Sequence, residues 1–158
     1  MMTGFHRFIC TGLGIGYIGK GAGTIAAMVC CFCWWLLKAG DRGYLISIIV
    51  TSLILVAGIW SAGKVETAWG KDNQRIVIDE VVGMCISLLW IPVQLPYLIT
   101  AFLLFRFFDI VKPLFIRKVE NLPGGWGVMF DDVLAGIYAN LLLQLIIATN
   151  FLSNVHIY

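Results

Sequence analysis

The sequence predicts an all-α, polytopic integral membrane protein: a small helical bundle with three long spanning helices and a helical hairpin turned by prolines. Of the 158 residues, 60% are hydrophobic and only 13% are charged, about half the charged share of a soluble domain. The uncharged stretches also reach 20 to 25 residues, the length that a bilayer requires. A soluble domain of this size has too little interior for so much apolar surface. We therefore expect a single membrane-embedded domain, 1–158.

The expected elements follow from the positions of the charges. A glycine-rich segment, 1–23, leads into the apolar run 21–37, which has about the minimum length for a span. Its Gly-x-Gly-x-x-Gly motif at 14–19 matches a dinucleotide-binding fingerprint in letters only, since no strand precedes it. We expect these glycines to form an irregular, closely packed entry to the first span. The clearest span is 44–63, a polar loop follows at 64–80, and the last span is 133–152.

The uncharged run 81–105 contains Pro92 and Pro96 and has two interpretations. As one kinked helix it crosses the membrane once. As two arms that turn between the prolines, it enters and leaves on the same side. The hairpin, at about residues 80–111, places nine Lys and Arg residues inside and two outside, whereas a single crossing divides them five to six. The positive-inside rule favours the hairpin, which also brings the loops 64–80 and 106–132 to the same cytoplasmic face.

Two acidic pairs, Asp79–Glu80 and Asp131–Asp132, directly precede apolar helices in this scheme. A carboxylate at a helix start accepts backbone N–H bonds and complements the helix dipole, which contributes about 0.3–1 kcal/mol. Four carboxylates on one face of the membrane also suit one or two divalent cations, and oxygen ligands favour Mg²⁺ or Mn²⁺. The spacing alone leaves capping and metal binding open.

Basic residues lie between the two acidic pairs. Arg106 and Lys112 follow an apolar segment, where they bind either a phosphate group or lipid headgroups. Arg117 and Glu120 are three residues apart and fit a surface ion pair. The glycine-rich turn at 123–127 either offers backbone N–H groups to an anion or simply returns the chain to the membrane.

Other polar residues are expected to pack rather than react. The five cysteines are odd in number and have no neighbouring ligands, so neither a disulfide framework nor a zinc site follows.

The net charge of +2 is too small to indicate nucleic acid as a partner. A stripe of small and polar residues predicts a packing face on the last helix: Asp132, Gly136, Asn140 and Gln144.

Several blocks occur in order over about residues 76–136: Ile78-Asp79-Glu80-Val81-Val82-Gly83-Met84, Phe105-Arg106-Phe107-Phe108-Asp109-Ile110-Val111-Lys112-Pro113, Ile116-Arg117, Leu122-Pro123-Gly124-Gly125-Trp126-Gly127-Val128-Met129, and Asp131-Asp132-x-x-Ala135-Gly136. In sequence and spacing they resemble the phosphatidylglycerophosphatase A family of bacterial membrane phosphatases. The N-terminal third differs. The family usually has Pro-Gly-Thr-x-Gly-Ser where this chain reads Ala22-Gly23-Thr24-Ile25-Ala26-Ala27.

The resemblance implies a phosphomonoesterase of phospholipid biosynthesis that depends on Mg²⁺, with Mn²⁺ as the alternative ion. It would convert phosphatidylglycerophosphate in the bilayer to phosphatidylglycerol, on the cytoplasmic face of the bacterial inner membrane. It further implies that the catalytic and metal-binding acids are Asp79, Glu80, Asp131 and Asp132. The phosphate-binding residues would be Arg106, Lys112 and Arg117, supported by Asp109, Glu120, Gly124 and Gly125. Water deprotonated by one acid is the expected nucleophile, and a phospho-aspartate route is the alternative.

Two other classes of function compete with this one. A small membrane transporter or channel would carry charges inside its spans, and the three long spans have none. A non-catalytic membrane scaffold, with capping acids and lipid-facing bases, would tolerate amide substitution at all four acids, whereas an enzyme would not.

Overall fold

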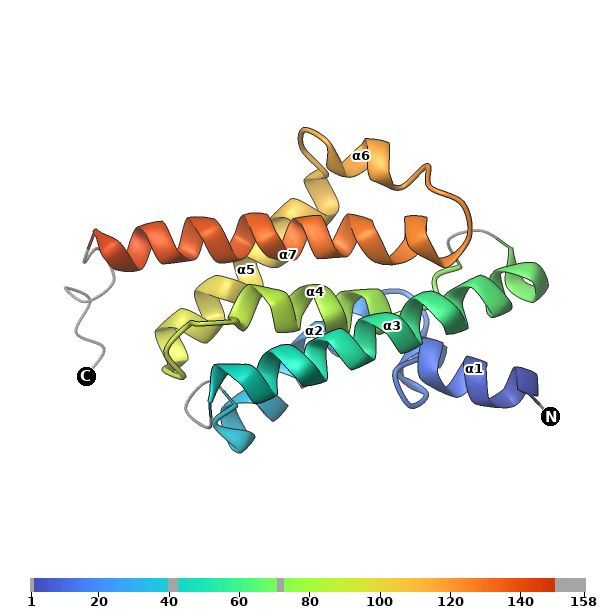
Figure 1. Cartoon of the computed structure of the whole chain (residues 1–158), viewed down its shortest axis with the longest axis horizontal. Coiled ribbons are helices and arrows are strands. Elements are labelled where there is room, and N and C mark those ends of the chain that lie inside the picture. The colour runs from blue at the N-terminus through green and yellow to red at the C-terminus, as the bar shows by residue number, and fades with distance from the viewer. Residues whose placement is uncertain (1, 40–42, 71–72, 150–158) are drawn as a thin grey trace.

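The computed structural model describes residues 2–39, 43–70 and 73–149, and these ranges contain helices and no strand (Figure 1). In chain order the elements are α1 (Met2–Cys10), the 3-10 helix η1 (Ile15–Ile18), α2 (Ala22–Leu37), α3 (Tyr44–Trp69), α4 (Ile78–Leu88), α5 (Leu95–Val111), α6 (Ile116–Val119) and α7 (Gly125–Ala148). The predicted all-α fold is confirmed for these ranges. Parts of the predicted link at 38–43, of the loop at 64–80 and of the chain end lie outside the described residues.

Helix α4 is the centre of the bundle. It contacts α2, α3, α5 and α7, and its largest interface is with α7. Figure 1 shows α4 lying between α7 and α3. Two glycines permit this approach: a Cβ at Gly83 would collide with the carbonyl of Asp132, and a Cβ at Gly136 would collide with the carbonyl of Gly83. Small residues thus bring the two acid-bearing helices into backbone contact.

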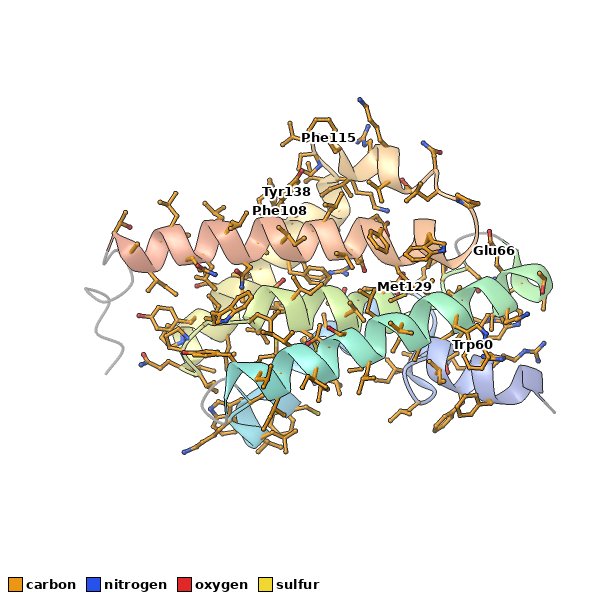
Figure 2. The ribbon with its side chains drawn as sticks, in the orientation of Figure 1. Trp60, Glu66, Phe108, Phe115, Met129 and Tyr138 are labelled. Atoms are coloured by element: carbon orange, nitrogen blue, oxygen red, sulfur yellow. The ribbon has the colours of Figure 1, made fainter. Side chains whose placement is uncertain are left out.

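Two apolar cores flank α4. One lies among α2, α4, α5 and α7 and includes the fully buried Met84 and Phe105. The other lies among α1, α3, α4 and α7 and includes Val82 and Met129. Figure 2 labels Met129 between α7 and α3, where its side chain fills the space above Gly58. The cores hold α4 on both sides, so its first turn has a defined position.

The chain reverses direction between α4 and α5. Helix α4 ends at Leu88, and α5 begins at Leu95 with a proline in its first turn. The start of α4 lies near Asp132, and the residue that ends α5, Lys112, contacts Asp131. Both outer ends of the pair therefore meet at the same part of α7. The two helices form a hairpin, as expected, rather than one kinked helix.

Asn140 on α7 secures the turn of this hairpin. Its side-chain amide donates to the carbonyls of Ile86, Ser87 and Leu89, at 3.1, 3.1 and 2.7 Å. These carbonyls lie at the C-terminal end of α4, where the helix supplies few donors of its own, although the Ile86 carbonyl also accepts from the Leu89 N–H at 3.2 Å. Gln144 in turn donates to the Asn140 side-chain oxygen at 2.6 Å. The predicted packing face of the last helix is confirmed for Asp132, Gly136 and Asn140, which are buried, and Asn140 acts as a cap for α4.

Two helix boundaries differ from the predictions. Helix α3 continues to Trp69, through the start of the predicted polar loop, because charged side chains near a helix end can reach the polar region without breaking the helix. Helix α7 begins at Gly125 rather than at 133. Its first residue packs against the carbonyl of Ile59 on α3, where a Cβ would collide. Both errors came from equating the ends of helices with the ends of uncharged runs.

Helices α3 and α7 are long and apolar enough to cross a membrane. The expectation of three long spans thus holds for two helices. Helix α2 has 16 residues, a length of about 24 Å, which is shorter than the roughly 30 Å hydrocarbon core. Large apolar side chains on α3 face outward, among them Leu45, Leu53 and Val56 at 65–70% exposure. An exposed apolar surface of this extent is typical of a protein that contacts lipid.

Candidate active site

Three carboxylates from two helices converge where α4 meets α7. Asp79 and Glu80 lie in the first turn of α4, and Asp132 lies on the buried face of α7. One carboxylate oxygen of each residue lies within 4.8 Å of the others. The backbone contact at Gly83 makes this convergence possible, because it brings α4 against the Asp132 carbonyl. The arrangement can bind a divalent cation through oxygen atoms.

Capping does not account for Asp131 and Asp132. They are the seventh and eighth residues of α7 and lie beyond the first turn, whose N–H groups need a cap. Both are buried, at 7% and 3% exposure. Burying a charge is costly unless it is paired or binds a metal, so their position inside a helix favours a role in chemistry. The capping interpretation is wrong for this pair.

One carboxylate oxygen of Glu80 receives no hydrogen bond from the described residues. This atom, Oε2, is buried. The Oε1 atom of Glu80 lies over Gly23 in the first turn of α2, where a Cβ would collide with it. An unpartnered carboxylate oxygen beside two other carboxylates fits a cation well. Sequence reasoning missed Gly23, although the family's N-terminal motif and this chain share a glycine-threonine pair there.

Asp79 shows the electrostatic cost of the cluster. Burial and then the neighbouring Glu80 raise the pKa of Asp79 well above its usual range. Two like charges about 4 Å apart repel by about 4 kcal/mol at an effective dielectric constant of 20. The cluster therefore either takes up protons or takes up a cation, and a bound cation would favour the charged form of the acids.

Lys112 links α5 to α7 beside this cluster. Its ammonium donates to Asp131 at 2.7 Å and to Glu120 at 3.3 Å. Burial alone would lower the pKa of Lys112, but the hydrogen bond and the charge of Asp131, with Glu120 added, outweigh it and raise the pKa. Lys112 is thus fully protonated at neutral pH and is a fixed positive charge at the edge of the cluster.

Arg106 and Asp109 form an ion pair on α5, where residues three apart lie on the same helix face. The charge of Asp109 acts on both Glu80 and Asp132, and that of Arg106 acts on Glu80. Five carboxylates from three helices thus gather with two cationic side chains, Arg106 and Lys112. When all are ionised, the excess of negative charge favours a divalent cation over a phosphate group alone.

The remaining predicted residues lie apart from the acids. Arg117 is exposed and donates to the Val111 carbonyl at 3.5 Å. Its predicted pair with Glu120 is wrong, because Glu120 bonds Lys112 instead. Gly124 and Gly125 lie where α7 begins against α3, and a Cβ at Gly125 would collide with the α3 backbone. In this structure the glycine turn positions α7 rather than contacting the carboxylates.

Comparison with known proteins agrees with these features. The family model described as Phosphatidylglycerophosphatase A matches residues 8–147. A Bacteroides thetaiotaomicron protein named "Putative phosphatidylinositol-3-phosphatase" is 45% identical over 142 residues, 85% of this chain and 89% of that protein. Proteins named phosphatidylglycerophosphatase A are 38% identical in Haemophilus influenzae (84% of this chain, 83% of that protein) and 28% identical in Escherichia coli K12 (92% and 85%).

No solved structure matches the chain. The family model covers every residue of the carboxylate cluster and both cationic side chains beside it. The chain therefore belongs to the phosphatidylglycerophosphatase A family and is a phosphatase.

Proposed function

We propose that the protein hydrolyses the terminal phosphate of phosphatidylglycerophosphate, giving phosphatidylglycerol and inorganic phosphate, in a reaction that depends on Mg²⁺. The observation that carries the proposal is the buried cluster of Asp79, Glu80 and Asp132, within 4.8 Å of one another, beside the Lys112–Asp131 pair. Two relatives named phosphatidylglycerophosphatase A support this substrate. The exposed apolar helices support a substrate that stays in the bilayer.

The residues that would hold Mg²⁺ are Asp79, Glu80, Asp131 and Asp132. All four supply oxygen atoms, which Mg²⁺ and Mn²⁺ prefer, and one carboxylate oxygen of Glu80 is buried without a hydrogen-bond partner among the described residues. When bound, the ion would polarise a phosphoryl oxygen as a Lewis acid. Asp131 would exchange part of its bond to Lys112 for this role.

The basic residues would bind the phosphate group of the substrate. Lys112, with a fixed positive charge, would bind a phosphate oxygen and stabilise the charge that develops during transfer. Arg106 would do the same through its planar guanidinium, oriented by the ion pair with Asp109. Arg117 is exposed and would bind the headgroup from the rim. Glu120 supports this set through its bond to Lys112.

The hydrolysis itself needs a nucleophile and a base. A water molecule would attack phosphorus while one carboxylate of the cluster accepts its proton, and the ester P–O bond would break as the glycerol oxygen gains a proton. The alternative route uses an aspartate as nucleophile and forms a phospho-aspartate. Trapping labelled phosphate on the protein would separate the two routes.

The membrane arrangement belongs to the same proposal. Helices α2, α3 and α7 would span the bacterial inner membrane as a single domain, and the α4–α5 hairpin would enter from the cytoplasmic side. The roughly 24 Å of α2 suits a crossing whose ends are completed by the flanking glycine-rich and polar segments. The carboxylate cluster would then lie at the cytoplasmic surface, within reach of a lipid headgroup.

One relative's name favours a second candidate substrate, phosphatidylinositol 3-phosphate. Both lipids carry a phosphate monoester on a polyol headgroup and two acyl chains, so the same cluster suits either one. Comparing phosphate release from the two lipids, at equal mole fraction in detergent, separates the candidates. The true substrate should have the higher kcat/KM by at least about tenfold, a difference of about 1.4 kcal/mol in transition-state binding.

Glu80→Gln tests the role of the cluster, with Glu66→Gln on α3 as its matched control. Glu80→Gln should lower kcat by about 10²–10³-fold, the usual loss when one group that stabilises transition-state charge is removed. Glu66→Gln should retain normal turnover, since Glu66 lies outside the cluster. Similar turnover in both variants, with both folded, would remove Glu80 from the catalytic machinery.

A further inference from the structure

An apolar cavity, here called the groove, extends along α2, α3 and α4 and reaches the first turn of α4, which carries Asp79 and Glu80. It has a volume of about 640 Å³, within the roughly 300–1,000 Å³ of ligand pockets. Helices α2, α3 and α4 form most of its wall, and nearly every side chain in it is apolar, with the hydroxyl of Ser47 as an exception. That hydroxyl already donates to the Ala39 carbonyl at 2.8 Å. The groove therefore suits a ligand that forms no hydrogen bonds.

The groove reaches the first turn of α4, the same turn that carries two of the acids. Ile78 and Val81 line it, and the two residues between them in sequence are Asp79 and Glu80. The next groove residue on α4 is Cys85, so one face of the helix belongs to the groove while its first turn carries the carboxylates. A molecule with a polar head at the cluster has an apolar path directly beside it.

The groove also extends along α2. Gly23, in its first turn, lies against Glu80. Groove residues begin at Ala26 and extend to Leu37 at the other end of the helix. The rise from Ala26 to Leu37 along the helix is about 17 Å, close to half of the roughly 30 Å hydrocarbon core. The groove is therefore about as long as one leaflet is deep.

We propose that this groove binds one acyl chain of the lipid substrate while the headgroup phosphate lies at the carboxylate cluster. The proposal rests on the proposed function for the identity of the substrate, and it adds a binding site for the part that does not react. Binding one acyl chain would fix the depth of the lipid in the membrane and the orientation of its headgroup. A larger fraction of bound lipids would then have the phosphate placed for reaction. A remote apolar contact would thereby contribute to turnover.

Bulky substitutions that fill the groove test the proposal. Cys33 on α2 and Val50 on α3 line it and are exposed, so Cys33→Trp and Val50→Trp should fold. Each has a matched control on the same helix that is exposed but does not line the groove: Met28→Trp and Leu53→Trp. The substrates are dipalmitoyl and dibutanoyl phosphatidylglycerophosphate, assayed at a fixed detergent concentration.

The groove variants should lower kcat/KM for the dipalmitoyl substrate by at least about tenfold, the loss expected when about two methylene groups are excluded. They should leave kcat/KM for the dibutanoyl substrate unchanged, because its chains do not reach residues 33 and 50. The control variants should match the wild type on both substrates. Equal effects on both substrates, or no effect on either, would overturn the acyl-chain site.

A binding measurement keeps the two proposals separate. Phosphatidylglycerol with a photoactivatable diazirine on one acyl chain is irradiated with the wild-type protein in vesicles, and the labelled peptides are identified by mass spectrometry. Labelling should concentrate on groove residues of α2 and α3 and fall in Cys33→Trp. Labelling spread over the outer face of α3, as expected for bulk lipid alone, would reject the groove. If the wild type hydrolyses neither substrate, the proposed reaction fails while this measurement still decides the site.

Discussion

Individual side chains in this protein are placed by the need to satisfy buried charge. Lys112 neutralises Asp131, Arg106 neutralises Asp109, and the three carboxylates of Asp79, Glu80 and Asp132 remain without a cation among the described side chains. The sequence identified the acids and the bases, because charges beside apolar runs are conspicuous. It could not assign their partners, since Glu120 pairs across a turn with Lys112 and not with its helical neighbour Arg117.

Lys112→Met isolates the contribution of one such pair. The change leaves the carboxylate of Asp131 buried without its partner, and we expect a loss of about 1–3 kcal/mol of folding free energy together with about a hundredfold lower kcat. The matched control is Lys118→Met, an exposed lysine over the Phe115 ring, which should change stability by less than about 0.5 kcal/mol. Thermal unfolding and phosphate release, both in detergent, measure the two effects. Equal behaviour of the two variants would show that the Lys112 pair has no special role.

At the scale of elements, the sequence predicted the order of the main helices but not where α3 ends or where α7 begins. The proline-containing run was correctly interpreted as a hairpin, because charge distribution penalised the alternative. Helix α7 begins eight residues earlier than expected, which turns Asp131 and Asp132 from caps into interior groups. Charge-free runs mark where lipid contact is tolerated, whereas acids facing another helix can lie well inside a helix. The sequence also gave no sign of the Gly23 contact with Glu80, because that contact joins α2 to α4 across the fold.

The contact of α4 with α7 should tolerate no added methyl group. Gly136→Ala would press a Cβ into the Gly83 backbone, so we expect a loss of about 1–3 kcal/mol and lower turnover as Asp132 moves away from Asp79. Gly63→Ala on α3 is the control, since its Cβ would meet its nearest neighbour at an ordinary 3.5 Å. Alanine favours a helix over glycine by up to about 1 kcal/mol, so this variant should be as stable or more stable. A stable, active Gly136→Ala protein would mean that the helices are less closely packed than described.

For the molecule as a whole, the bundle combines a largely apolar exterior with a buried cluster of acids. The long, apolar helices α3 and α7 flank the short helix α4 (Figure 1), which carries Asp79 and Glu80 in its first turn. Composition and the uncharged runs predicted the helical fold, and two of the helices have the length and apolar character of membrane spans. Two of the three expected long spans, α3 and α7, are long and apolar enough to cross a membrane, whereas α2 is apolar but has only 16 residues.

The proposed orientation predicts which loops face the cytoplasm. In a background without native cysteines, Lys118→Cys should react with a membrane-impermeant maleimide only in inside-out vesicles. Lys38→Cys, at the opposite end of α2, should react only in intact spheroplasts. Both lysines are exposed, so reagent access depends on the side of the membrane alone. The reverse labelling pattern would place the carboxylate cluster on the outer face and contradict the positive-inside assignment.

The most direct test of the central claim is phosphate release from phosphatidylglycerophosphate by the purified wild-type protein in detergent, with Mg²⁺, with excess chelator, and with Mg²⁺ restored. A cation-dependent carboxylate site predicts that release stops on chelation and returns when Mg²⁺ is added back. Release that continues unchanged in chelator would contradict a metal role for Asp79, Glu80 and Asp132. No release under any condition, from a protein shown to be folded, would contradict the proposed reaction with this lipid.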